Sequence, residues 1–458
     1  MDIAKAAIRV LIHPLWMLKD EKLGIYRYLK DFERSQYYPA ERIREIQLSK
    51  LRDLLDHAYG NCAFYKARFD KIGLRPSDIN SFEDFAHVPY LTKSDIQENL
   101  PSLAAGNYRI TDLIPNKTGG STGHPIHFYH DKERFTSMDA SAIRHDRWAG
   151  YDIGDKLALI WGHRGDVSNF ANLVGKIKER VLMRSKILDS ASMSREGMES
   201  FMQKLRSFQP HTILAYAGSV HLFAQFCRER GVTDIRPRTI ITTAEVLRDD
   251  QRKSIEGTFN CRVFNRYGCR EVSVIASECE AHEGMHINAD ALYVEFVKDD
   301  GSPAKPGETG NIIITDLYNY GMPFIRYKIE DMGIMTDKKC SCGRGLPLME
   351  MMAGRVTDFL ITPEGTKVSG AALTIYIIAN TPGVKQAQFV QNNEASLILK
   401  IVRGKEFNHE SVKFLDKKLP EFFGRSMKVE LQFVDDIPKE ASGKYRFSVC
   451  NLKNDKKS

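Results

Sequence analysis

Apolar residues recur at intervals of three and four along two stretches of the chain, and this spacing is typical of amphipathic helices. One stretch covers residues 41–59, and Gly60 follows it in the position expected of a C-terminal cap. The other begins after Ser194 and carries Met198, Phe201, Met202 and Leu205. Shorter apolar runs have the length of buried strands: Leu157–Trp161, Thr212–Ala215 and Thr239–Thr242. This alternation predicts an α/β fold in which helices cover the sheets.

From about residue 287 the pattern changes to strands and turns. Ala291–Val297 is predicted to pair with Gly310–Thr315, and a hairpin is expected at Pro363–Gly365. Towards the C-terminus, three strands and one helix predict a compact α+β unit: Val384–Val390, Ala395–Val402, Met427–Phe433 and a helix with Val412, Leu415, Leu419, Phe422 and Phe423 on one face. The sequence therefore predicts a large N-terminal domain of helix-covered sheets with a β-rich subdomain, followed by a small α+β domain.

The predicted boundaries divide the chain into an amphipathic helical segment, an N-terminal domain, a C-terminal domain and a flexible tail: 1–40, 41–356, 357–453 and 454–458. The apolar stretch Ala6–Leu18 is too short to cross a bilayer and lacks the cleavage pattern of a signal peptide. Residues 5–36 mix Lys, Arg and aromatic residues with aliphatic ones. They could lie on an anionic membrane surface or pack on the body of the protein, and the pattern leaves both alternatives open.

Composition narrows the class of protein. With 458 residues, 42% hydrophobic and 27% charged, the chain has the balance of a globular protein of two or three domains. The 66 basic and 59 acidic residues give a net charge of +7, which favours anionic ligands without requiring nucleic acid. Eight cysteines in a chain of this length do not form a disulfide scaffold. We therefore expect a cytoplasmic enzyme.

The densest cluster of glycine and hydroxyl residues lies at Lys117–Pro125. Glycines allow successive backbone N–H groups to face one point, and Ser and Thr hydroxyls add further donors, so such a loop can bind an anion. The loop lacks the GK[ST] ending of the P-loop. The alternative is that this segment is a flexible surface turn. Only further motifs elsewhere in the chain can distinguish an anion-binding loop from such a turn.

Four further segments follow in a fixed order. They are Thr243–Glu245, Tyr267–Glu271, the pair Arg326–Asp331 and Gly354–Asp358, and Pro438–Lys444. Together with the Gly-rich loop, this ordered set resembles the core motifs of the adenylate-forming, AMP-binding superfamily. Any one of these motifs is weak evidence for the resemblance. Five of them in the same order as in the superfamily are not reasonably explained by coincidence.

Three more elements resemble the phenylacetate–CoA ligase-like branch, which includes relatives assigned to capsular polysaccharide biosynthesis. They are Asn61–Tyr65 within the stretch Leu51–Tyr90, Met322–Tyr327 and Cys340–Arg344. The resemblance covers roughly residues 40–450. It implies a mobile C-terminal domain and a reaction in which a carboxylic acid and ATP form an acyl-adenylate and pyrophosphate. It further implies transfer of the acyl group to coenzyme A, with an amine such as an amino sugar as the variant acceptor.

The resemblance implies a role for each motif residue. Lys444 would bridge the acid and the α-phosphate. Glu271 would hold Mg²⁺, Tyr267 would face adenine, and Asp331 would accept hydrogen bonds from the ribose. The remaining ATP-binding residues that it implies are Thr118, Gly119, Gly120, Ser121, Thr122, Gly123, Ala244, Glu245, Gly268 and Arg355.

The chain departs from the family pattern at three positions. His124 stands where many relatives carry Lys, and a neutral imidazole offers less charge to a phosphate. Arg270 replaces a hydroxyl residue, and its guanidinium could bind the α-phosphate or the substrate carboxylate. It could equally pair with Glu271, which would compromise the metal site. Thr357 takes the place of an acidic hinge residue, so Asp358 is the nearest carboxylate. These changes affect the expected rate and the second half-reaction more than adenylation itself.

Cys279, His286, Cys340 and Cys342 form a candidate structural zinc site. Three thiolates and one imidazole are typical of a closed tetrahedral site. His282 competes with His286 for the fourth position, but His286 fits the spacing of related ligases better. Reduced cysteines without metal are the alternative. If zinc binds, it would join the loop after Tyr267–Glu271 to the segment before Gly354.

The acid itself is not indicated by the sequence. The resemblance places the acyl pocket at Trp161, His163, Arg164 and Tyr216, and Arg164 would favour an acid with a second polar or negative group. A catalytically degenerate AMP-binding scaffold that acts by partner binding is the second hypothesis. A nucleic-acid-binding protein built on the cysteines would leave the Gly-rich loop and Lys444 unexplained, so we expect no nucleic-acid partner. The sequence gives no indication of the oligomeric state.

Overall fold

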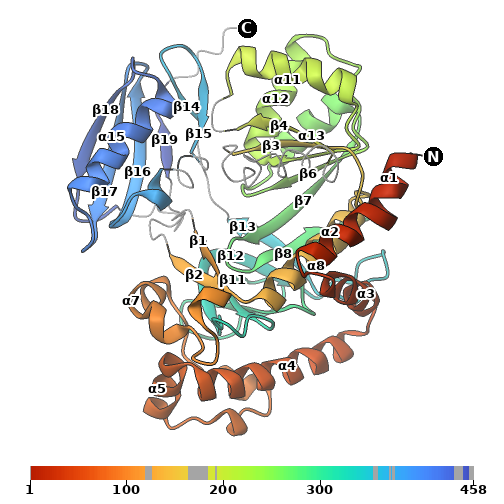
Figure 1. The fold of residues 1–458 in the computed structure, drawn as a ribbon, viewed down its shortest axis with the longest axis vertical. Helices are drawn as coiled ribbons and strands as arrows, with labels where there is room; N and C mark the ends of the chain where they lie inside the picture. The colour runs from red at the N-terminus through yellow and green to blue at the C-terminus, as the bar shows by residue number, and fades with distance from the viewer. Residues whose placement is uncertain are drawn as a thin grey trace.

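The structure is a computed structural model that describes residues 2–118, 126–162, 184–190, 193–353, 359–370, 373, 377–437 and 447–452. It is a mixed α/β protein in which a large region rich in sheet is followed by a small C-terminal unit (Figure 1). The predicted fold class is confirmed. Among the described residues, no helix combines the length and the apolar character that crossing a bilayer requires.

The first part of the chain is mainly helical. Its elements are α1 (Ile3–Ala7), the π-helical turn η1 (Ile8–Ile12), α2 (His13–Lys19), α3 (Gly24–Ser35), α4 (Ala40–Asn61), α5 (Ala63–Ile72), η2 (Pro76–Asp78), α6 (Phe82–Phe85), α7 (Lys93–Leu103), η3 (Ile110–Asp112), the hairpin strands β1 (Ile114–Lys117) and β2 (His127–His130), and α8 (Lys132–Trp148). The predicted cap at Gly60 is wrong. The chain turns instead at Cys62, whose extended backbone ends α4 and begins α5, and Gly73 caps α5 with φ +67°.

Parallel strands form one half of a large sheet in the order β4-β3-β5-β6-β7. These elements alternate with helices: β3 (Leu157–Trp161), β4 (Ser185–Asp189), α11 (Arg195–Phe208), β5 (Thr212–Tyr216), α12 (Ala217–Glu229), β6 (Thr239–Thr243), α13 (Asp249–Phe259) and β7 (Arg262–Cys269). The predicted strands and the predicted helix after Ser194 are confirmed, and Ser194 caps α11 by accepting from the Gly197 N–H. The buried residues of α11, α12 and α13 form one core with the strands.

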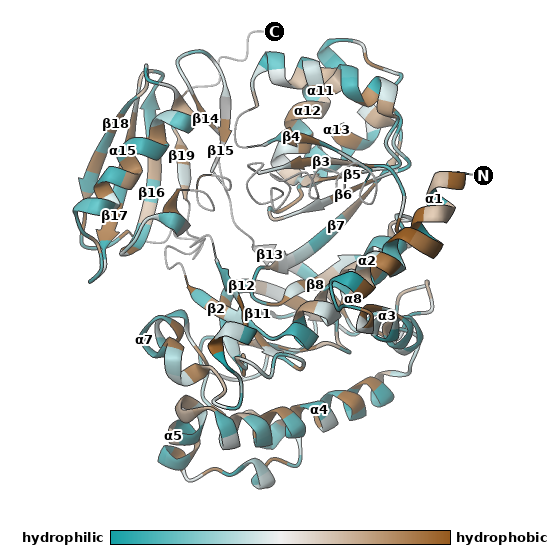
Figure 2. Cartoon of the chain, in the orientation of Figure 1, coloured by the Kyte–Doolittle hydropathy of each residue, from teal (hydrophilic) through white to brown (hydrophobic). Residues whose placement is uncertain are grey.

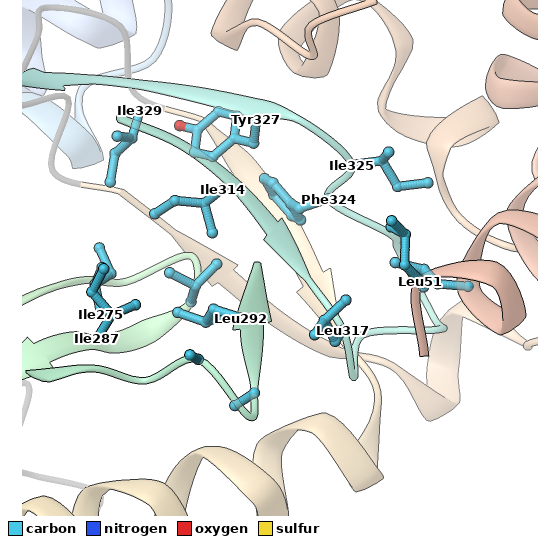
Figure 3. Packing of buried hydrophobic residues seen from close by; sticks show 14 of the residues in the cluster. Leu51, Ile275, Ile287, Leu292, Ile314, Leu317, Phe324, Ile325, Tyr327 and Ile329 are labelled. Atoms are coloured by element: carbon cyan, nitrogen blue, oxygen red, sulfur yellow. The ribbon is translucent and has the colours of Figure 1, made fainter. Parts of the chain in front are cut away.

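Antiparallel strands continue the same sheet from β7 in the order β8-β9-β13-β12-β11-β10. They are β8 (Ser273–Glu278), β9 (Met285–Ile287), β10 (Leu292–Val297), β11 (Thr309–Asp316), β12 (Tyr327–Thr336) and β13 (Leu348–Ala353). The predicted pairing of β10 with β11 is confirmed. Figure 3 shows the core of this half, where Leu51 of α4 joins isoleucines and leucines of the strands and Phe324.

The C-terminal unit has its own buried core. It contains β14 (Phe359–Ile361), β15 (Lys367–Ser369), η5 (Ile378–Asn380), β16 (Val384–Asn393), β17 (Ser396–Arg403), α15 (His409–Phe423), β18 (Lys428–Phe433) and β19 (Ser448–Cys450). The predicted hairpin appears as the antiparallel pair β14–β15, and the predicted strands and helix are confirmed. The sequence prediction missed β19, which extends β16 in parallel.

Candidate active site

Strand β7 changes its pairing half-way along its length. Its first residues pair in parallel with β6, whereas Arg266–Cys269 pair antiparallel with β8. Gly268 is required at this change, because a Cβ atom there would lie 2.4 Å from the carbonyl oxygen of Ser273. The predicted motif Tyr267–Glu271 therefore lies where the parallel half of the sheet meets the antiparallel half.

Two hydrogen bonds join this motif to β12. The Tyr267 hydroxyl donates to Oδ2 of Asp331 over 2.8 Å. The Tyr327 hydroxyl donates to Oε1 of Glu271 over 2.8 Å, and both of these side chains are buried. Burial and the neighbouring Glu271 carboxylate raise the pKa of Tyr327 well above its usual value, so the hydroxyl remains a donor.

Two further contacts join the motif to the β1–β2 hairpin. His130 of β2 places Nε2 2.8 Å from the backbone carbonyl of Glu271. Burial lowers the pKa of His130 to about 4, so the ring is neutral at pH 7 and donates through this nitrogen. Nη1 of Arg270 lies 3.5 Å from the carbonyl oxygen of Lys117. The hairpin, β7 and β12 thus meet at Glu271.

Thr118 lies at the base of the predicted phosphate loop. Its N–H donates to the Ile126 carbonyl over 3.0 Å, and its Oγ1 accepts from the Ile126 N–H over 3.1 Å. This pair fixes the two ends of the segment 119–125. The predicted residues Gly119, Gly120, Ser121, Thr122 and Gly123, together with His124, lie outside the described residues.

The carboxyl ends of the parallel strands carry two other predicted groups. Ala244 follows β6 with φ +66°, an uncommon left-handed conformation, and the Glu245 carboxylate accepts from the Gly218 N–H over 2.7 Å. Trp161 ends β3 and Tyr216 ends β5, and their ring centroids are 4.7 Å apart. His163, Arg164, Arg355 and Lys444 lie outside the described residues, as do Thr357 and Asp358.

The four predicted metal ligands form a cluster in which all ligand atoms lie within 4.8 Å of one another. Sγ of Cys279 is 3.6 Å from Sγ of Cys340, and Sγ of Cys342 is 3.3 Å from Nε2 of His286. A tetrahedral zinc ion with bonds of about 2.3 Å to sulfur would hold two sulfurs about 3.8 Å apart. The donor set therefore fits zinc in chemistry and in spacing.

Hydrogen bonds orient this cluster. Nδ1 of His286 lies 3.1 Å from the Leu346 carbonyl, so it carries the proton and directs Nε2 to the sulfurs. Burial lowers the pKa of His286, which keeps the ring neutral. Backbone N–H groups of Ala281 and Arg344 donate to the sulfurs of Cys279 and Cys342. The rival ligand His282 instead places Nδ1 3.1 Å from Glu278.

Sequence reasoning gave no role to several residues that build these sites. Tyr327 and His130 position Glu271, but nothing in their local sequence indicates contacts with a residue 56 or 141 positions away. Tyr65 donates to the Pro323 carbonyl over 2.8 Å. This contact gives a physical reason why the elements Asn61–Tyr65 and Met322–Tyr327 occur together.

The amino-acid sequence is similar to those of known proteins over most of its length. The chain is 26% identical over 442 residues to Protein CapK of Staphylococcus aureus, covering 93% of this chain and 94% of that protein. It is 26% identical over 365 residues to the phenylacetate–coenzyme A ligase of Thermus thermophilus, covering 78% of this chain and 80% of that protein. The chain is a homologue of Protein CapK and of the phenylacetate–coenzyme A ligases. The resemblance inferred from the motifs is thereby confirmed.

The C-terminal unit and the fold agree with this relationship. Residues 360–451 match the family model described as the CapK C-terminal domain. A solved structure of 2-hydroxyisobutyryl-CoA ligase in complex with 2-HIB-AMP and CoA aligns with a TM-score of 0.61 at 19% identity, covering 91% of this chain and 92% of that chain. The fold is therefore shared with a CoA ligase over most of both chains.

Proposed function

We propose that the chain is an ATP-dependent ligase that activates a carboxylic acid as its acyl-adenylate and then transfers the acyl group to coenzyme A. The observation that carries the proposal is the meeting of three distant motifs at Glu271. The β1–β2 hairpin, the turn after β7 and β12 are joined there by the contacts of His130, Tyr327 and Tyr267. The phenylacetate–coenzyme A ligases among its homologues support the same reaction class.

The reaction proceeds in two steps. A carboxylate oxygen of the acid attacks the α-phosphorus of ATP, and the bond from that phosphorus to the bridging oxygen breaks, so pyrophosphate leaves with the electron pair. The thiol sulfur of coenzyme A then attacks the acyl carbon. The bond from this carbon to the AMP oxygen breaks, AMP leaves, and the thiol proton passes to solvent.

The residues present suit the first step. Tyr267 offers a ring face to adenine and holds Asp331 in place through its hydroxyl, so the carboxylate is positioned to accept from the ribose hydroxyls. Arg270 beside Lys117 offers positive charge next to the phosphate loop. Lys444 would bridge the acid and the α-phosphate, which lowers the barrier where negative charge builds up.

Mg²⁺ and zinc are proposed for different sites. The buried Glu271 carboxylate, oriented by Tyr327, supplies the oxygen donor that Mg²⁺ prefers, and the ion would neutralise phosphate charge. Cys279, His286, Cys340 and Cys342 would hold zinc in a closed structural site.

The acid would lie at the carboxyl ends of β3 and β5, where Trp161 packs on Tyr216. His163 and Arg164 are proposed to complete this pocket. If Arg164 faces the acid, Arg164→Ala changes the order of preference within a panel of acids, with dicarboxylic or hydroxylated acids losing most. An unchanged order of preference contradicts this assignment.

The domain boundaries near 357 and 453 and the cytoplasmic location stay predictions.

ATP–pyrophosphate exchange with a panel of acids tests the proposed adenylation. At least one acid should stimulate exchange, and Lys444→Ala should lower it about 10²- to 10³-fold, because one preorganised donor to the developing charge is lost. Lys439→Ala, in the same motif, is the matched control and should retain exchange within about threefold. If no acid stimulates exchange above the Lys444→Ala level, the scaffold hypothesis replaces the ligase.

The acceptor is tested separately. Mass spectrometry of products formed with coenzyme A and with amino sugars distinguishes a thioester from an amide. We expect the thioester. An amide formed without thioester would assign the second step to an amine while leaving the adenylation intact.

A further inference from the structure

The helical segment Ile3–Lys19 is apolar on two opposite sides. On one side Ile8, His13 and Met17 are buried against the body of the protein. The five-residue step from Ile8 to His13 matches the π-helical turn η1, in which the His13 N–H donates to the Ile8 carbonyl. The segment is therefore held in place by one face, and the other face is left for solvent or a partner.

The opposite side exposes large aliphatic side chains. Their exposed fractions are 82% for Ile3, 76% for Val10, 60% for Leu11, 58% for Leu15 and 57% for Leu18. With Leu23, residues 3–23 contain six of the ten exposed large apolar residues found among the described residues. Figure 2 shows the brown and pale residues of this segment at the margin of the molecule, beside the N-terminus. A concentration of this kind marks a binding surface.

The N-terminal segment has a small excess of positive charge, much of it paired with acidic residues of the protein body. Residues 2–36 contain seven Lys or Arg and five Asp or Glu, an excess of two positive charges. Lys5 and Arg9 reach towards the body and pair with Asp155 and Asp152. Lys19 is exposed, and its Nζ lies 5.0 Å from the Trp16 ring centroid. Trp16 itself is half-buried against the protein and donates to Asp20 over 2.8 Å, which leaves Lys19 as an exposed cation beside the apolar face.

The size of the face decides between a protein partner and a lipid surface. A 17-residue helix is about 26 Å long and about 10 Å wide, so one face offers about 260 Å². A stable protein interface buries about 800 Å² on each partner. A bilayer sets no such minimum, because each inserted side chain contributes separately and nearby cations add attraction to anionic headgroups.

We propose that residues 3–23 bind the surface of an anionic phospholipid bilayer, with Ile3, Val10, Leu11, Leu15 and Leu18 inserted at the headgroup boundary. The chain then lies on one leaflet as a peripheral protein. This surface is separate from the proposed ligase site, so its test does not depend on activity.

Co-sedimentation of the full chain with phosphatidylcholine vesicles, with and without the anionic lipid phosphatidylglycerol, tests the proposal. The full chain should bind the anionic vesicles, and the variant Val10→Ser/Leu11→Ser/Leu15→Ser/Leu18→Ser should bind at least about tenfold more weakly. Ile72→Ser/Ile110→Ser removes exposed aliphatic residues elsewhere and should bind within about twofold of the unchanged chain. Lys19→Glu should weaken binding to anionic vesicles only, and added salt should do the same.

Three results overturn the proposal. The chain could remain in the supernatant with both kinds of vesicle, or the four-serine variant could bind as tightly as the unchanged chain. A dimer that the four-serine substitution dissociates in the absence of vesicles would assign the face to a second copy. Circular dichroism and urea denaturation of each variant verify that the substitutions left the fold intact.

Discussion

Strand β8 has a different polar cluster at each end. Glu271 comes just before it and belongs to an oxygen cluster with Tyr327, whereas Cys279 comes just after it and belongs to a sulfur cluster with Cys340. Glu271 and Cys279 are eight positions apart in the sequence, so the two lie at most about 26 Å apart. One short strand thus connects donors suited to a phosphate-bound hard cation with donors suited to a soft one.

The two clusters are held in different ways. The oxygen cluster depends on buried side chains from three elements that are far apart in sequence. The sulfur cluster depends on two loops with backbone N–H donors and on His286. Under the proposed function, the sulfur cluster would maintain the scaffold and the oxygen cluster would carry out chemistry, and substitutions at each end of β8 can separate these roles.

The largest effect is expected from Cys340→Ser. Loss of one thiolate should abolish stoichiometric zinc and lower the free energy of unfolding by about 5 kcal/mol, because metal binding contributes directly to folding. Zinc content by mass spectrometry and urea denaturation measure this. Cys261→Ser, at a partly buried cysteine outside the cluster, should keep the zinc. Two results together would contradict a metal site. The purified unchanged protein would contain no zinc, and Cys340→Ser would have the same free energy of unfolding as the unchanged protein.

Glu271→Gln should come next. It keeps the side-chain shape but removes the charge that would hold Mg²⁺, so ATP–pyrophosphate exchange should fall about 10²- to 10³-fold, which corresponds to about 3–4 kcal/mol. Zinc content should stay at the level of the unchanged protein. If exchange persists, or if zinc is lost together with activity, the two ends of β8 do not have separate roles.

His130→Gln should alter the pH dependence of stability. Because burial lowers the pKa of His130 from 6.5 to about 4, unfolding takes up a proton between these values, and stability is lost as pH falls through this window. Between pH 7 and pH 5 this residue should account for about 2 kcal/mol of the loss. Gln retains an N–H donor without titrating, so urea denaturation of the variant should show a correspondingly flatter dependence. If the free energy of unfolding changed equally with pH in the variant and in the unchanged protein, the low pKa assigned to His130 would be contradicted.

Tyr327→Phe should have the smallest effect. It removes only the hydroxyl that orients Glu271, so exchange should fall about fivefold, equivalent to about 1 kcal/mol. The loss should appear mainly as weaker Mg²⁺ affinity, measured as a higher Mg²⁺ concentration for half-maximal rate. A fall in rate at unchanged Mg²⁺ dependence would assign Tyr327 to another step.

Local patterns predicted much of the fold. The apolar runs of β3, β5 and β6 and the spacing in α11 are local, and the structure agrees with them closely. The cap predicted at Gly60 was wrong because glycine can also lie within a helix. The C-terminus of α4 is set instead by the extended backbone of Cys62. Strand β19 was missed because a three-residue strand carries almost no periodicity and is defined by its partner β16.

The candidate site divides in the same way. The cysteines could be grouped because two lie one residue apart and thiols have few roles in such a chain. The spacing of related ligases favours His286 over His282, and in the structure His286 joins the cysteines whereas His282 contacts Glu278. Tyr327 and His130 could not be assigned to Glu271, because sheet pairing across long stretches of sequence creates these contacts.

A crystal structure with α,β-methylene-ATP and Mg²⁺ tests the central claim most directly, because this analogue cannot be cleaved at the reacting bond. The account predicts adenine against the Tyr267 ring, ribose hydroxyls donating to Asp331, and Mg²⁺ bound by Glu271. A nucleotide that occupies another part of the molecule, or none bound at saturating concentration, would contradict it.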